Sequence, residues 1–380
     1  MRLAIVSEGF SPYIGGVETR YTELASKLAQ KHEISILTIL KDDNDGFDPP
    51  WKERIDGITV HRLPQTGEYF LADGTRSARG LAGFLARALS EMGGRDFDAV
   101  ICSEWPLAHV PPVALLRNSL CVVDWHEVWG RYYLSFGMKG LIGYLLERAV
   151  ARMPRLKHVA VSNFTKSRLV SHLGVPSPHV AVIPSGVNTR AFDALNVKKE
   201  EGQLIYFGRF MPHKHIEWLI EAFERLVRSE PELSLRIIGD GPLRKSLEER
   251  TRGADGIEIL GPLTREKLIR ELKAAWIAAI PSVREGQGIS YLEAMAAGTP
   301  VVAVQSPLSA VRELIENDRN GLIVEASPQG LIRGITSFLR DRDLWSRISE
   351  AGRRTALCYD WDECATRFND LLEDGVNGKG

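Results

Sequence analysis

Short apolar runs alternate with helix-forming patterns from the start of the chain. The run RLAIVS (2–7) is followed by apolar residues at helical spacing from Val17 to Leu28, and then by EISILTIL (33–40). Apolar runs of this length between turn residues indicate strands buried on both faces, and the order strand, helix, strand predicts a right-handed β-α-β unit. Further strands are predicted at 58–63, 98–103, 120–125, 158–162 and 180–184.

The alternation stops once and then resumes. The polar stretch 188–203 interrupts the rhythm, so we interpret it as a linker. Beyond it, a helix is predicted at 215–228, and the chain ends in helical segments at 328–357 and 361–373. Two successive series of strands and helices predict an α/β protein with two doubly wound domains. Strands of the second series are predicted at 204–209, 234–239, 257–261, 276–281, 300–304 and 321–324.

Composition narrows the class of protein. The 380 residues exceed the usual size of one hydrophobic core, and 44% hydrophobic with 26% charged residues is typical of a soluble globular protein. A net charge of −1 gives no sign of a nucleic-acid partner. The N-terminal apolar run is too short for a secretory signal. The uncharged stretch 294–311 is a poor candidate for a transmembrane helix, because glycine and proline residues break it. The four cysteines have no CxxC spacing, so we expect reduced thiols and a cytoplasmic protein.

Candidate binding residues follow the predicted strands, at the edge of the sheet where doubly wound folds bind ligands. In EGFSPYIGGVE (8–18), Gly15 and Gly16 precede a helix. Backbone amides at such a helix start attract phosphate, although a plain turn also uses glycine.

The segment WHEVWGRYYLSFG (125–137) places His126 and Glu127 where a strand ends. An imidazole there is suited to contact a reacting sugar or to transfer a proton. The aromatic residues that follow either stack on a sugar and shape an acceptor pocket, or pack in the interior. They include Trp129, Tyr132 and Tyr133.

A third loop, GRFMPHKHIEW (208–218), carries Arg209 and Lys214 on either side of a turn into a helix. A guanidinium and an ammonium together suit a diphosphate, whereas the alternative is a pair of solvated surface cations. In the next strand-end turn, Gly239 and Gly241 allow close approach of a ligand. That turn lacks the third glycine of GxGxxG, which argues against a nicotinamide cofactor.

The segment REGQGISYLE (284–293) contains two carboxylates around a glycine turn. Glu285 lies in the predicted loop, and a helix is predicted from about Ile289. Amides from Gly288 to Ser290 are placed to bind phosphate. Glu293 falls one turn inside the helix, where a carboxylate is suited to accept two ribose hydroxyls.

Taken together, these motifs resemble those of the retaining GT-B glycosyltransferases of family 4. The resemblance covers nearly the whole chain, and its strongest element is the E-x7-E pattern from Glu285 to Glu293. The order and spacing of the other motifs add to it: GGVE (15–18), HE (126–127), VSNFTKSRL (161–169), VIPSGVN (182–188), FGRFMPHK (207–214) and GDGPL (239–243).

The resemblance implies a GT-B fold, in which two Rossmann-like domains face a deep cleft. Residues 1–190 would form the acceptor-side domain, 191–357 the nucleotide-sugar domain, and 358–380 a C-terminal helix that returns to the first domain. It also implies transfer of a sugar from a nucleotide-diphosphate sugar to an acceptor hydroxyl, with retention of configuration and without a bound metal or other cofactor. A front-face mechanism, in which the departing phosphate helps to deprotonate the acceptor, is the family's usual proposal.

The family's roles transfer to this chain residue by residue. Arg209 and Lys214 would neutralise the diphosphate, Glu293 would hold the ribose, and Glu285 would contact the transferred sugar. His126 would lie near the reacting face. The remaining donor-side residues would be Gly15, Gly16, Gly239, Gly241, Gly261, Pro262, Leu263, Gly286, Gln287, Gly288, Ile289 and Ser290, and the acceptor side would include Glu127, Trp129, Tyr132 and Tyr133.

Three departures from the family pattern stand out. Gln287 occupies a position where an aromatic is common, and Ser185 and Asn188 replace the usual Asn and Asp. PHKH (212–215) replaces the common PEKG but keeps the phosphate-binding cation.

Other readings predict different features. A metal-dependent transferase needs a DxD triplet after a buried strand, and none of the triplets at 43–45, 96–98, 341–343 and 360–362 follows one. A nucleotide-sugar epimerase, a phosphorylase or a non-catalytic nucleotide-sugar binder can share this fold, although no lysine is assignable to a phosphorylase's pyridoxal phosphate.

The acceptor, a carbohydrate or a lipid-linked molecule, is not fixed by the sequence, and neither are the base, the sugar or the oligomeric state. The segment 137–157 mixes apolar and basic residues at helical spacing. This pattern indicates either a core helix with a basic outer face or an interfacial helix in peripheral contact with the cytoplasmic membrane face.

Overall fold

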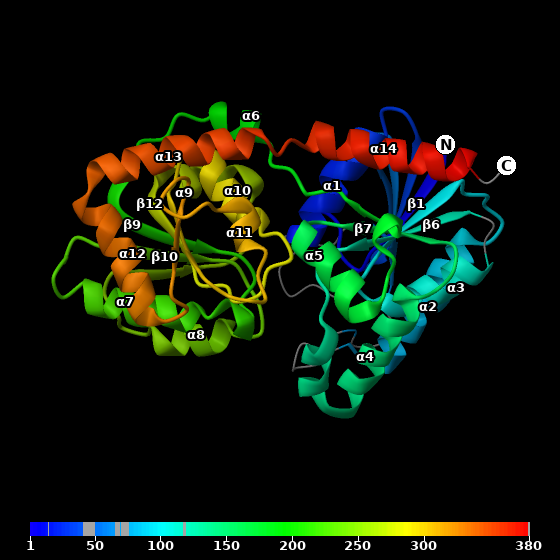
Figure 1. The fold of residues 1–380 in the computed structure, drawn as a ribbon, viewed down its shortest axis with the longest axis horizontal. Coiled ribbons are helices and arrows are strands. Elements are labelled where there is room, and N and C mark those ends of the chain that lie inside the picture. Colours follow the sequence, from blue (N-terminus) through cyan, green and yellow to red (C-terminus); the bar gives the residue numbers. More distant parts are fainter. Residues whose placement is uncertain (14, 41–49, 65–68, 70–75, 117–118, 379–380) are drawn as a thin grey trace. The chain divides into compact units, whose positions relative to one another are not determined.

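A computed structural model describes residues 1–13, 15–40, 50–64, 69, 76–116 and 119–378. The chain forms two compact units: Met1–Pro184 together with Trp361–Gly380, and Ser185–Asp360 (Figure 1). The return of the C-terminal helix to the first unit, expected for the GT-B fold, is confirmed.

The first unit contains an eight-stranded sheet in the order β3-β4-β2-β1-β5-β6-β7-β8. Its strands are parallel except for the antiparallel pair β3 and β4. The strand order reverses between β1 and β5, which is where such sheets place a ligand. The strands are β1 (Arg2–Val6), β2 (Glu33–Ile39), β3 (Lys52–Ile55), β4 (Ile58–Leu63), β5 (Ala99–Ser103), β6 (Leu120–Trp125), β7 (Leu156–Ala160) and β8 (Val180–Val182).

Alternate residues of β1 pack on opposite faces of this sheet. Leu3 and Ile5 belong to the core shared with α1 and α14, which lie side by side in Figure 1, and Ala4 and Val6 to the core under α2, α3 and α4. Burial on both faces explains the continuous apolar strands of the sequence. The helices are α1 (Gly16–Leu28), α2 (Ala78–Met92), α3 (Val110–Leu116), α4 (Gly137–Ala151), α5 (Asn163–Arg168) and α14 (Trp361–Asn377), with short turns η1 (Leu107–His109), η2 (Gly130–Phe136), η3 (Leu169–Leu173) and η4 (Ser177–His179).

The second unit contains a fully parallel six-stranded sheet in the order β11-β10-β9-β12-β13-β14. Here the order reverses between β9 and β12. Helices α7 and α12 cover one face, and α9 and α10 the other. The elements are β9 (Glu200–Phe207), β10 (Ser234–Ile238), β11 (Ile257–Leu260), β12 (Ala275–Ile280), β13 (Val301–Val304), β14 (Leu322–Val324), α6 (Thr189–Asp193), η5 (Pro212–Lys214), α7 (Ile216–Leu226), α8 (Arg244–Arg250), α9 (Arg265–Ala274), α10 (Ile289–Ala296), α11 (Val311–Leu314), α12 (Pro328–Arg340) and α13 (Arg342–Leu357).

The interpretation of 188–203 as a linker is wrong for about half of its residues. Helix α6 lies within it, and β9 begins at Glu200 rather than at 204. The polar start of β9 hid the strand, because Gly202 takes a positive φ of 82° and the pairing with β12 shifts register beside it. The short strand β3 was also missed, since Lys52, Glu53 and Arg54 are charged and none of its four residues is buried.

No helix among the described residues is long and apolar enough to cross a membrane.

Candidate active site

Two loops of the second unit flank the point where its strand order reverses. The loop after β9 ends in η5 with Lys214, and the loop after β12 carries Glu285. The Lys214 Nζ lies 2.6 Å from the Glu285 Oε1, and both side chains remain partly exposed. The Val283 amide donates to the His213 carbonyl at 3.0 Å, so the backbones of the two loops are also joined. The sheet therefore brings together two residues that are 71 positions apart in the sequence.

Positive charge concentrates around this pair. Burial lowers the pKa of His213, and the cations Lys214 and Arg284, then His215 and Arg209, lower it further, to about 3. The Arg209 side chain is exposed, and no described residue pairs with its guanidinium. The neutral His213 imidazole thus lies among the side chains of Lys214, Arg284 and Arg209, a surrounding that would favour an anion.

The glycines after β10 have a structural cause within their own unit. Gly239 and Gly241 take positive φ values of 143° and 153°. A Cβ on Gly239 would lie 2.0 Å from the Gly208 carbonyl oxygen, and one on Gly241 would lie 2.6 Å from that of Phe210. These glycines let the β9 and β10 loops pack backbone against backbone, which fixes the position of Arg209.

The glycine turn before α10 is held from two sides. Gly288, the N-cap of α10, has a φ of 94°, and a Cβ there would lie 2.4 Å from the ring of Tyr291. The buried Gln287 amide accepts from the Ser185 N–H at 2.7 Å and donates to the Ser185 carbonyl at 2.8 Å. Gln287 thus fastens this loop to the start of the unit, while Ile289 and Ser290 remain partly exposed.

Glu293 lies one turn into α10, and its side chain is only 9% exposed. It forms an ion pair with Arg265, whose guanidinium also lies 5.4 Å from the centre of the Phe192 ring. Arg265 begins α9 two residues after Leu263, the last residue of the Gly261–Pro262–Leu263 segment, with Thr264 as the N-cap between them. The residues expected to hold the ribose and to border the base are therefore linked through one arginine.

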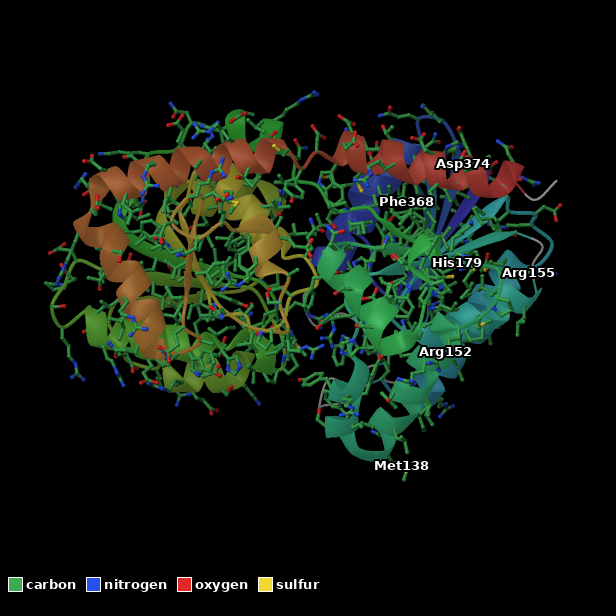
Figure 2. All side chains as sticks on the ribbon, viewed as in Figure 1. Met138, Arg152, Arg155, His179, Phe368 and Asp374 are labelled. Carbon is green, nitrogen blue, oxygen red and sulfur yellow. The ribbon has the colours of Figure 1, made fainter. Side chains whose placement is uncertain are left out.

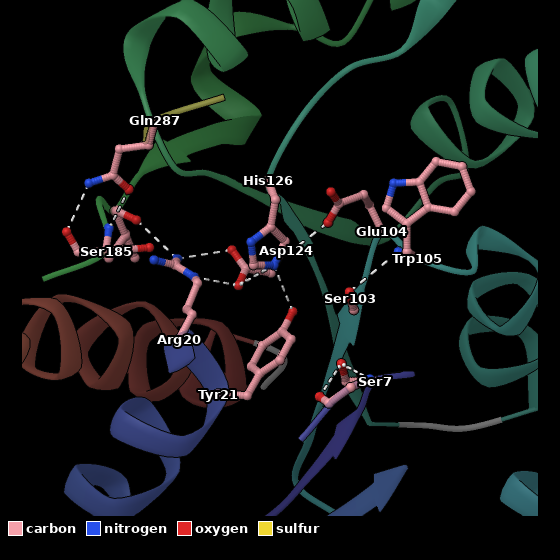
Figure 3. A network of polar contacts seen from close by, with 12 residues as sticks. Ser7, Arg20, Tyr21, Ser103, Glu104, Trp105, Asp124, His126, Ser185 and Gln287 are labelled. Atoms are coloured by element: carbon pink, nitrogen blue, oxygen red, sulfur yellow. Dashed lines mark hydrogen bonds and ion pairs between the residues drawn. The ribbon is translucent and has the colours of Figure 1, made fainter. Parts of the chain in front are cut away.

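In the first unit, His126 lies at the end of β6 in a buried polar network (Figure 3). Its Nε2 lies 3.2 Å from the Tyr21 hydroxyl and 3.6 Å from carboxylate oxygens of both Glu104 and Asp124. Asp124 accepts two hydrogen bonds from the fully buried Arg20, at 2.8 and 3.0 Å. The lines in Figure 3 trace this chain of contacts through residues of α1, β6 and the loop after β5.

The network holds two neutral groups beside one ion pair. Burial lowers the pKa of His126 to about 4, although Asp124 opposes this effect. Burial also raises the pKa of Glu104 well above its usual range, against the hydrogen bond from the His126 backbone. His126 is therefore neutral at pH 7, and Glu104 favours its protonated form.

An aromatic cluster follows His126. Trp129 lies 5.2 Å from Tyr132 and 5.4 Å from Tyr133 between ring centroids. Trp105, from the loop after β5, completes it at 4.8 Å from Trp129. Tyr133 is buried, whereas Trp129, Tyr132 and Glu127 are partly exposed.

Beside the cluster, the Arg76 guanidinium lies 4.6 Å from the centre of the Trp105 ring and pairs with Glu8 at 2.8 Å. At the start of α1, the buried Glu18 carboxylate occupies the space that a Cβ on Gly15 would need. That the Gly16 amide donates a hydrogen bond to the diphosphate remains a prediction.

Several of these contacts were not predicted from the sequence. The unpredicted residues are charged or aromatic and lie in loops, at strand ends or in the first two turns of a helix: Glu8, Arg20, Arg76, Glu104, Trp105, Asp124, Arg265 and Arg284. Asp124 and Glu104 carried a signal, because each ends or follows an apolar strand.

Within the described ranges, no group of three or more His, Cys, Asp or Glu side chains is placed to hold a metal ion. The triplet at 43–45 lies outside these ranges.

Two family models match this chain, one in each half. Residues 15–186 match the glycosyl transferase 4-like domain, and residues 187–355 match the glycosyl transferases group 1. A D-inositol 3-phosphate glycosyltransferase from Geodermatophilus obscurus is 30% identical over 92% of this chain and 82% of its own. This chain belongs to the group 1 glycosyltransferases.

Two further comparisons bear on this glycosyltransferase. A GDP-mannose-dependent α-(1-6)-phosphatidylinositol monomannoside mannosyltransferase from Mycobacterium tuberculosis is 26% identical over 98% of both chains. The structure of a sucrose-phosphate synthase from Thermosynechococcus elongatus superposes with a TM-score of 0.80, at 20% identity over 98% of both chains. The fold is therefore GT-B.

Proposed function

We propose that this glycosyltransferase uses a nucleoside-diphosphate sugar as its donor and transfers the sugar to an acceptor hydroxyl with retention of configuration. The observation that carries the proposal is the cation group at the switch point of the second sheet. Lys214, Arg209 and Arg284 all act electrostatically on His213, at the edge where doubly wound sheets bind nucleotides. A diphosphate is the ligand that such a cluster suits.

These cations also suit the chemistry of donor cleavage. The leaving diphosphate gains negative charge as the bond to the sugar breaks, and a fixed ammonium and guanidinium stabilise it most at that point. Lys214 is held by Glu285, so its position is set before the donor binds. Glu285 keeps oxygen atoms available for the hydroxyls of the transferred sugar.

Glu293 is assigned to the ribose. Its ion pair with Arg265 holds the carboxylate in place, and a carboxylate is suited to accept two adjacent hydroxyls. The segment from Gly261 to Leu263 is assigned to the base through backbone contacts, so it places little restriction on which base is bound.

His126 is assigned to the sugar as a neutral hydrogen-bonding group. With a pKa of about 4, the ring is not a cationic acid at pH 7. This favours contact with the reacting sugar over proton donation, and it fits a mechanism in which the leaving phosphate takes the acceptor proton.

The test is a donor panel. The protein is incubated with UDP-, GDP- and ADP-linked sugars, with and without acceptor extracts, while nucleoside diphosphate release and the anomeric configuration of the product are measured. Glu293→Ala is expected to lower turnover by orders of magnitude. An epimerised donor, or binding without turnover on every acceptor, would replace the proposal with an epimerase or a binding protein. An inverted product would refute retention alone.

Metal independence is the second part of the proposal. Turnover is expected to persist in EDTA, because the cations of the second unit take the role of a metal. Complete loss of activity in EDTA that manganese restores would contradict it.

A further inference from the structure

The outer face of α4 and the adjoining η2 turn carries large apolar side chains in solvent. Met138, Ile142 and Leu145 are 75%, 64% and 56% exposed, and Leu141 is 38% exposed. Together with Leu134 and Phe136 they form what we call the α4 surface. Six of the nine exposed large hydrophobic residues in the described part of the chain lie in this segment. Scattered apolar residues are ordinary on a protein surface, but a contiguous group marks an interaction site.

The helix is amphipathic with its apolar face turned outward. Met138, Leu141, Ile142 and Leu145 follow the i, i+3, i+4, i+7 spacing of one helix face. The opposite face is the buried one and consists of Gly140, Glu147, Val150 and Ala151. Figure 1 shows α4 at the periphery of the first unit, and Figure 2 shows Met138 pointing away from it. Of the two interpretations of this segment, the core helix with a basic outer side fits only on the inner face, where Val150 and Ala151 belong to the core. The outer face is apolar rather than basic.

The charges around this surface are positive. The segment of η2 and α4, residues 130–151, contains three basic residues, Arg131, Lys139 and Arg148, and one acid, Glu147. That acid is 1% exposed and accepts hydrogen bonds from the Trp129 and Gly130 amides at 2.8 and 2.9 Å. Lys139 and Arg148 lie on either side of the apolar stripe. Lys139 is exposed, so its ammonium can reach phosphate groups while its stem stays against apolar surface. Arg148 donates to the His172 carbonyl at 3.0 Å, which holds its positive charge beside the stripe.

We propose that the α4 surface docks the protein on an anionic lipid bilayer. The apolar stripe would enter the headgroup boundary, and the basic flanks would contact lipid phosphates. A second copy of the chain fits less well. A symmetric contact across the stripe would bring Lys139 and Arg148 toward their own counterparts, and the one carboxylate among the described residues of η2 and α4, Glu147, is buried.

Docking would also place the acceptor. On its buried face, α4 holds the segment just after His126 through Glu147. If the proposed function is correct, this arrangement favours a lipid-linked acceptor, because Tyr133 of the aromatic cluster packs against α4, the helix that carries the bilayer contact. This consequence rests on the proposed function, whereas the bilayer contact does not.

Flotation with vesicles tests the contact without donor or acceptor. Wild-type protein is expected to float with vesicles of phosphatidylcholine mixed with phosphatidylglycerol, and far less with phosphatidylcholine alone. Ile142→Ser and Met138→Ser are each expected to lower the partition coefficient about tenfold. Lys139→Glu is expected to lower it about fivefold or more, on the anionic vesicles only.

Matched controls come from elsewhere in the chain. Leu115→Ser removes a side chain that is 74% exposed in the same unit, and Lys245→Glu reverses an exposed charge in the other unit. Both are expected to bind vesicles like the wild type. Equal binding of the Ile142 and Leu115 variants, or no preference for anionic vesicles, would overturn the proposal. The proposal would also be overturned if the wild type did not bind vesicles but formed a dimer that Ile142→Ser dissociates.

The acceptor consequence is measured separately. On a lipid-linked acceptor in anionic vesicles, the Ile142→Ser variant is expected to turn over more slowly than the wild type. Its rate of donor hydrolysis in solution is expected to equal that of the wild type. Vesicle binding without any turnover would preserve the bilayer contact and refute the proposed function.

Discussion

At the scale of single residues, two ion pairs set the positions of Lys214, Glu285 and Glu293 in the candidate site. Lys214 and Glu285 are both partly exposed, and their contact joins two loops. Glu293 of α10 and Arg265 of α9 form a second pair. The Glu285 and Glu293 side chains are 12% and 9% exposed, so each pair holds a largely buried carboxylate in one position.

Lys214→Ala tests the role of the ammonium. The variant is expected to fold normally and to lose about a hundredfold or more in kcat, because a preorganised charge opposite the leaving group is removed. Lys245→Ala, an exposed lysine of α8 in the same unit, is the control and should leave kcat unchanged. Near-normal turnover by the Lys214 variant in steady-state assays would show that the diphosphate binds elsewhere.

A buried histidine gives the protein a defined pH response. The Trp125 indole donates to the Nδ1 of His158 at 3.0 Å, and burial lowers the pKa of His158 to about 4. In the unfolded chain the ring titrates near 6.5, so between about pH 6.5 and 4 the unfolded state binds more protons. Stability is therefore fully present above pH 6.5 and is lost as the pH falls toward 4.

His158→Gln keeps an acceptor for Trp125 but does not titrate. Its free energy of unfolding, measured by urea denaturation across this window, is expected to fall by up to about 3 kcal/mol less than that of the wild type. Parallel curves for the two proteins would mean that His158 protonates in the folded state without cost.

The sequence predicted the charged residues of the second unit but not their partners. The strands and helices next to the charged site residues had a clear apolar periodicity, and in a parallel sheet the strands end at the same edge. These residues are Arg209, Lys214, Glu285 and Glu293. Arg265 could not be paired with Glu293 in advance, because their contact depends on how α9 and α10 pack on the sheet.

At the scale of elements, the site rests on turns that accept only certain residues. Gly288 starts α10 with a φ of 94°, and Gln287 binds the backbone of Ser185. The departure from the family pattern at Gln287 thus has a structural role, which the sequence alone did not reveal because the partner lies 102 residues away.

Gly288→Ala combines backbone strain with a clash against the Tyr291 ring. It is expected to cost more than about 2 kcal/mol of unfolding free energy and to weaken donor binding, because the start of α10 must shift. Gly253→Ala isolates the strain, since Gly253 has a φ of 76° and open space around its Cβ position. It should cost about 1 kcal/mol and leave binding unchanged. Equal losses of unfolding free energy for both variants in urea denaturation would show that the Tyr291 ring moves aside without cost.

At the scale of the whole molecule, the chain leaves its first unit at Pro184 and returns to it at Trp361. The sequence predicted this path only through the family resemblance, because the periodicity of the last helix says nothing about which sheet it covers. Phe368 and Leu372 of α14 are fully buried in the core with Tyr21 and Leu24 of α1. The last helix is thus part of the first hydrophobic core, while residues 185–360 form cores of their own.

Two phenylalanine variants test this division. Phe368→Ala removes a fully buried ring of the first unit, and Phe338→Ala removes one of the second. Each is expected to cost about 3–5 kcal/mol. Hydrogen exchange measured on peptides in moderate urea should show faster exchange in residues 1–184 and 361–378 for the first variant, and in residues 185–360 for the second. Because each hydrophobic core lies within one unit, each variant should accelerate hydrogen exchange in its own unit and leave the other unit unchanged. Uniform acceleration across the chain in both would mean that the two units unfold as one cooperative body.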